Sequence, residues 1–146
     1  MMWAKGWTFL FSLCCGIGAA TSLPAQARLN ELGICSAHFK ARSDWLAELG
    51  KNEVTAEMFR AYSERLLDWA AADAPKPVDC RMMTYPFSTD CNPRHLAAIR
   101  DEAATAILTT FVENGYETAG LPTCIEDSVC THCVDVLKGL PDDQTR

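Results

Sequence analysis

Three cysteines and a histidine lie within ten residues near the carboxyl end of the chain, in the sequence CIEDSVCTHC, residues 124–133. A cysteine can act as a nucleophile, ligate a metal or form a disulfide, so three kinds of chemistry are open to this segment. Cys130 and Cys133 have the C-x-x-C spacing of a redox dithiol and of half a zinc site. Which chemistry applies depends on the compartment of the protein and on the helices that position these cysteines.

The amino-terminal segment has the features of a signal peptide. One basic residue, Lys5, precedes the uncharged and mostly apolar run of residues 7–23, and Ala25-Gln26-Ala27 forms an A-x-A cleavage site. The run is shorter than the roughly 20 strongly apolar residues that span a bilayer, so we favour cleavage over a retained membrane anchor. We expect residues 1–27 to be a signal peptide and residues 28–146 to form one exported domain, periplasmic or secreted.

Cleavage after Ala27 would remove two of the eight cysteines and leave six. An even number of cysteines in an exported chain is typical of disulfides. The six are Cys35, Cys80, Cys91, Cys124, Cys130 and Cys133. We favour the pairs Cys35–Cys133, Cys80–Cys91 and Cys124–Cys130, although the sequence does not decide among the possible arrangements.

The pair Cys124–Cys130 depends on where the last helix begins. Six helical steps separate these residues by about 9 Å, which is too far for a disulfide. Either Cys124 lies outside regular helix, or Cys130 pairs with Cys133 and Cys124 pairs with Cys35.

The hydrophobic spacing is helical almost throughout and predicts an all-α fold. We expect four helices, at about 29–49, 55–72, 93–114 and 124–138. Thr55 is a predicted N-cap, Gly50 and Gly115 follow helix ends, and Thr123 with Glu126 forms a predicted capping box. The expected architecture is two helical hairpins joined by a proline-rich crossover, residues 72–91, and cross-linked by disulfides.

The helix start also decides between a redox site and structural disulfides. If the helix began near Cys124, the C-x-x-C pair would lie inside it, away from the N-terminal N–H groups that lower a thiol pKa. If it began at Ser128, Cys130 would lie in the first turn, and a redox role for Cys130 and Cys133 would gain support. His132, between the two cysteines, is a residue type that can stabilise a thiolate.

Metal binding is a further alternative. Zinc would need Cys124 and His132 to complete a set with Cys130 and Cys133, and Met82 with Met83 could suit copper. Structural disulfides and apolar packing explain the same residues, and we expect no cofactor and no metal.

Two cysteine spacings resemble those of the saposin family: ten residues between Cys80 and Cys91, and five between Cys124 and Cys130. The resemblance implies a small secreted helical protein that binds lipid. The chain departs from the family pattern because Cys35 stands alone where the family has C-x2-C, and Cys133 is additional.

The charge of the chain restricts its partners. The net charge is −6, and it becomes −7 when Lys5 leaves with the signal peptide. No basic stripe is present, so we expect neither a nucleic-acid partner nor, after cleavage, a membrane surface. No nucleophile motif accompanies the three histidines. We therefore expect a non-enzymatic protein that binds a protein partner, with the redox protein and metal or lipid binding as alternatives.

Overall fold

The computed structural model of the 146-residue chain describes residues 22–73 and 93–142. These residues form five helices and no strand, which confirms the expected all-α class. The helices are α1 (Ser22–Glu48), α2 (Glu53–Asp73), α3 (Pro93–Glu113), α4 (Tyr116–Ala119) and α5 (Ser128–Lys138). Within the described ranges, none of these helices combines the length and the apolar character needed to cross a membrane.

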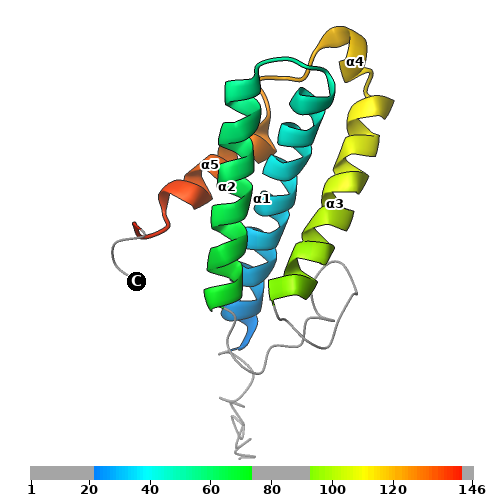
Figure 1. The fold of residues 1–146 in the computed structure, drawn as a ribbon. Coiled ribbons are helices and arrows are strands. Elements are labelled where there is room, and N and C mark those ends of the chain that lie inside the picture. The colour runs from blue at the N-terminus through cyan, green and yellow to red at the C-terminus, as the bar shows by residue number, and fades with distance from the viewer. Residues whose placement is uncertain (1–21, 74–92, 143–146) are drawn as a thin grey trace, which may run out of the picture.

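Helices α1 and α2 form the expected antiparallel hairpin (Figure 1). Gly50, with φ of 60°, takes the predicted left-handed conformation after α1. The predicted N-cap Thr55 is wrong, because α2 begins two residues earlier at Glu53. Asn52 caps the helix instead, since its Oδ1 accepts a hydrogen bond from Thr55 N at 3.4 Å.

Helix α1 begins at Ser22 rather than at the expected residue 29. Pro24 does not prevent this, because the first four N–H groups of a helix have no partner within it. The described core side chains of α1 begin at Leu29, which is 2% exposed, whereas Ala27 and Arg28 are exposed.

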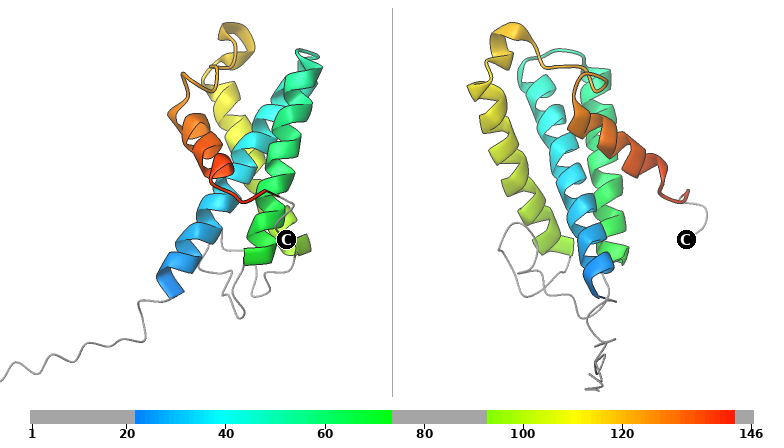
Figure 2. Two further views of the ribbon diagram at one scale, coloured as in Figure 1. Left: turned by 90° about the vertical axis from the view of Figure 1, so that its left-hand side faces the viewer. Right: turned by 180° about the vertical axis from the view of Figure 1, so that it is seen from behind.

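The arrangement of the remaining helices differs from two hairpins. Helix α3 runs beside α1 in the same direction, so α1, α2 and α3 form an up-down-up layer (Figure 1). Helix α5 crosses α1 and α2 obliquely on one face of this layer, as the view from behind shows (Figure 2). Its main partner is α1 rather than α3, because α4 and residues 120–127 carry the chain away from α3.

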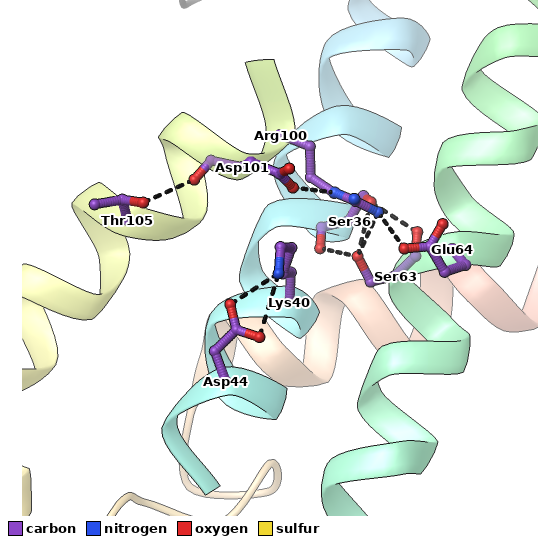
Figure 3. A network of polar contacts seen from close by, with 8 residues as sticks. All are labelled: Ser36, Lys40, Asp44, Ser63, Glu64, Arg100, Asp101 and Thr105. Atoms are coloured by element: carbon purple, nitrogen blue, oxygen red, sulfur yellow. Dashed lines mark hydrogen bonds and ion pairs between the residues drawn. The ribbon is translucent and has the colours of Figure 1, made fainter. Parts of the chain in front are cut away.

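This arrangement encloses α1 on several sides, so that it is buried nearly all round between Cys35 and Ser43. Short side chains make the close packing possible. Ser36 Oγ and Ser63 Oγ each donate a hydrogen bond of 2.7 Å to the other residue's carbonyl oxygen, where α1 meets α2. Figure 3 shows Arg100 of α3 reaching the same place, where it bonds Glu64 at 2.7 Å. Three helices therefore share one polar contact.

The proline-rich crossover between α2 and α3 lies almost entirely outside the described residues. The expected Cys80–Cys91 disulfide and the copper candidates Met82 and Met83 fall there as well. Helix α3 begins at Pro93, as predicted.

Candidate functional site

Two disulfides attach α5 to the rest of the protein. Cys35 of α1 is bonded to Cys133 of α5 across 98 residues of sequence, and Cys124 is bonded to Cys130 across six. These are the two favoured pairs that fall within the described residues. Cys35, Cys130 and Cys133 are each no more than 1% exposed.

Helix α5 begins at Ser128, so the expected start near residue 124 is wrong. Asp127 is its N-cap, and Asp127 Oδ1 accepts hydrogen bonds from Val129 N at 2.9 Å and Cys130 N at 3.2 Å. The predicted Thr123–Glu126 pair does form, but it closes a turn before the helix. Because Cys124 lies outside regular helix, its Cα comes to 5.0 Å from that of Cys130, which permits their disulfide.

The position of Cys130 meets only one condition for a redox dithiol. It is the third residue of α5 and therefore lies in the first turn. However, Cys130 and Cys133 are bonded to different partners rather than to each other. His132 is 61% exposed at its side chain and its Nε2 lies 2.9 Å from Oε1 of Glu31 in α1, whereas Cys130 and Cys133 are buried. These contacts are those of structural cross-links.

The same disulfides occupy the sulfurs that zinc would need. A sulfur in a disulfide is not a thiolate and does not serve as a zinc ligand. Among residues 22–73 and 93–142, no group of three or more His, Cys, Asp or Glu side chains is placed to hold a metal ion.

A buried cluster of charged and titratable side chains lies beside the start of α5. Arg42 of α1, 2% exposed, donates from one terminal nitrogen to Asp127 Oδ2 at 2.7 Å and from the other to the Pro122 carbonyl at 3.0 Å. Arg42 Nε also donates to His38 Nε2 at 3.3 Å, and its guanidinium lies over the Phe59 ring. Arg42 thus holds residues 122–127 against α1.

The environment of this cluster sets its protonation. Burial is the main cause that lowers the pKa of His38, and the nearby Arg42 charge adds to it, outweighing the opposite influence of Asp127. Partial burial would raise the pKa of Asp127, but the hydrogen bonds from Arg42 and Cys130 N, the charge of His38 in its protonated form and the charge of Arg42 together lower it. At neutral pH the cluster therefore contains a neutral His38, whose Nε2 accepts a hydrogen bond from Arg42 Nε, and an ionised Asp127.

The cluster does not have the geometry of a hydrolytic triad. In a triad the histidine uses one ring nitrogen for the carboxylate and the other for the nucleophile. Here Nε2 of His38 faces both Arg42 and Asp127, at 3.3 and 3.2 Å. No hydrogen bond joins Ser128, the nearby hydroxyl, to His38 within the described part of the chain. The arrangement fixes residues 122–127 and the start of α5 against α1.

An open cleft of about 520 Å³ lies next to the cluster, between α1, the second half of α3 and residues 122–129. Ile34, Ile107, Phe111 and Val129 supply its apolar lining, and Ile34 and Val129 are 40% and 46% exposed. Polar residues that include His38, Asn114 and Glu126 complete it. Apolar walls with a few polar groups are typical of a binding site.

Sequence reasoning did not identify this cleft or the cluster beside it. One signal was present: Arg42 occupies a position in the apolar stripe of the first helix, and a buried arginine requires a carboxylate partner. That partner, Asp127, lies 85 residues away and could not be chosen from several acidic residues by local spacing.

Comparison with known proteins adds no family to this description. The sequence matches no protein-family model, no curated protein and no solved structure.

Proposed function

We propose that the protein is an exported, non-enzymatic binding protein, and that the cleft beside α5 receives a segment of a protein partner. One observation carries the proposal: the exposed apolar side chains Ile34 and Val129 line the same cleft, from two different elements. Exposure of apolar side chains to water is unfavourable, and a bound partner removes this penalty because it excludes water from them.

The rigidity of the cleft supports the same function. One wall, residues 122–129, is held to α1 by the Arg42–Asp127 ion pair and to α5 by the Cys124–Cys130 disulfide. The Cys35–Cys133 disulfide then fixes α5 to α1. A preformed site loses less conformational entropy on binding, and this favours affinity.

Export is supported by the sequence and is compatible with the structure. The lysine, the apolar run and the A-x-A site form the pattern of a signal peptide. Disulfides persist in oxidising compartments, and two are present in the described residues. Leu29, the first described core residue of α1, follows the proposed cleavage site by two positions, so cleavage would spare the core.

The experiment compares capture of partners by three proteins: the wild type, Val129→Asp and Val54→Asp. Both valines occupy the second position of a helix and are exposed, at 46% and 81%, but only Val129 lines the cleft. Aspartate is favourable near a helix N-terminus, so both variants should fold. Exported proteins from the cells that make this chain would be captured on each and quantified by mass spectrometry.

We expect at least one protein to be enriched on the wild type and on Val54→Asp and to be lost on Val129→Asp. If Val129→Asp captures the same proteins in the same amounts as Val54→Asp, the cleft is not the binding site.

A further inference from the structure

The charges around the cleft restrict the partner segment further. Among the described residues, no lysine or arginine lines the cleft, whereas two carboxylates do, Glu126 and Asp127. Asp127 is already paired with Arg42, and burial lowers the pKa of His38 and keeps it neutral at pH 7. Of the cleft-lining residues that the structure describes, Glu126 is therefore the one with an uncompensated charge.

Glu126 is held in place although it is exposed. Its Oε2 accepts hydrogen bonds from Thr123 N at 2.9 Å and from Thr123 Oγ1 at 2.8 Å. These bonds also lower its pKa, so the carboxylate stays ionised. Its other oxygen, Oε1, makes no hydrogen bond to another described residue. A fixed carboxylate with one available oxygen is a good acceptor for a cation from outside.

We infer that the cleft selects a partner segment in which an apolar side chain is followed closely by lysine or arginine. The apolar side chain enters between Ile107, Phe111 and Val129, and the cation meets Glu126 at the rim. This inference rests on the proposed function. The net charge of −6 for the whole chain also favours a basic partner segment, because it attracts positive charge over longer distances.

Three short peptides test the inference: acetyl-Leu-Leu-Lys-amide, acetyl-Leu-Leu-Gln-amide and acetyl-Leu-Leu-Glu-amide. They keep the apolar part constant and change only the charge. Each would be titrated into isotope-labelled wild-type protein and into Glu126→Gln at low ionic strength, and amide chemical shifts would give the site and the dissociation constant. Glu117→Gln, a change at another exposed carboxylate in α4, serves as the control for net charge.

We expect the lysine peptide to bind about threefold tighter than the glutamine peptide, since exposed ion pairs contribute little each. The glutamate peptide should bind more weakly than both. The preference for lysine should disappear in Glu126→Gln, persist in Glu117→Gln and weaken when salt is added.

Equal binding of the three peptides at the cleft would overturn the charge selection and leave the proposed function intact. A lysine preference that survives in Glu126→Gln would also overturn it. If none of the three peptides changes the amide chemical shift of any cleft residue, the proposed function itself fails for segments of this kind.

Discussion

The ion pair between Arg42 and Asp127 offers the sharpest test of how the cleft is built. Replacing Asp127 by alanine removes the N-cap of α5, which costs about 1 kcal/mol. It also leaves Arg42, 2% exposed, without its carboxylate. Loss of one partner from a fully buried pair costs about 3 to 5 kcal/mol.

Two features of the structure reduce that second cost. Asp127 is 19% exposed at its side chain, and Arg42 keeps its bond to the Pro122 carbonyl. We therefore assign about 2 to 3 kcal/mol to the ion pair, and the free energy of unfolding of Asp127→Ala should fall by about 3 to 4 kcal/mol in total. Urea unfolding at neutral pH, followed by circular dichroism with the disulfides intact, measures this change.

Two further variants separate the contributions. Asp127→Asn keeps a capping side chain and should lose only the ion-pair part. Asp44→Ala removes a carboxylate that is 43% exposed and paired with Lys40, so it should cost less than about 1 kcal/mol. If Asp127→Ala were as mild as Asp44→Ala, the cluster would not hold α5, and the reasoning about the cleft wall would be refuted.

Three other predictions concern the remaining contacts. The pKa of His38 in the folded protein lies below its value in the unfolded chain, about 6.5, so the free energy of unfolding of the wild type should decrease as pH falls through about 6.5. Urea unfolding at pH 7.5 and pH 5 measures this decrease, which should be smaller in His38→Gln. Replacing both Cys35 and Cys133 by alanine opens a link of 98 residues and should lower the free energy of unfolding by about 4 to 5 kcal/mol; a loss below 1 kcal/mol would contradict the structural role. Ser63→Ala removes the hydrogen bond from Ser63 Oγ to the Ser36 carbonyl and keeps the one from Ser36 Oγ to the backbone carbonyl of residue 63. This variant should cost about 1 kcal/mol in urea unfolding and should not change peptide binding at the cleft, which neither serine lines.

The three long helices were predictable because their signals are local. Apolar spacing at three and four residues identified them, and Pro93 and Gly50 marked a beginning and an end. Helix α4 was not predicted, since a helix of four residues has no periodicity to detect. The second hairpin was wrong because the partner of α5 is set by packing and by the bond to Cys35 rather than by neighbouring sequence.

The start of α5 shows how two local signals compete. Thr123 with Glu126 has the capping-box spacing, and Asp127 is an equally good N-cap one turn later. The structure uses both, the first for a turn and the second for the helix, because Asp127 also meets Arg42. That contact joins residues far apart in sequence, so only the folded chain reveals the choice.

The cleft depends on Cys130 and Cys133 being bonded to Cys124 and Cys35, and a disulfide map tests this directly. Purified protein would be denatured in acid without reductant, digested with trypsin and a glutamate-specific protease, and analysed by mass spectrometry with electron-transfer fragmentation. The structure predicts one species that links residues 32–40, 118–126 and 127–138 through two disulfides. A bond between Cys130 and Cys133 would instead release residues 127–138 as a separate peptide. That result, or free thiols at these two positions, would contradict the structural role and support a redox dithiol.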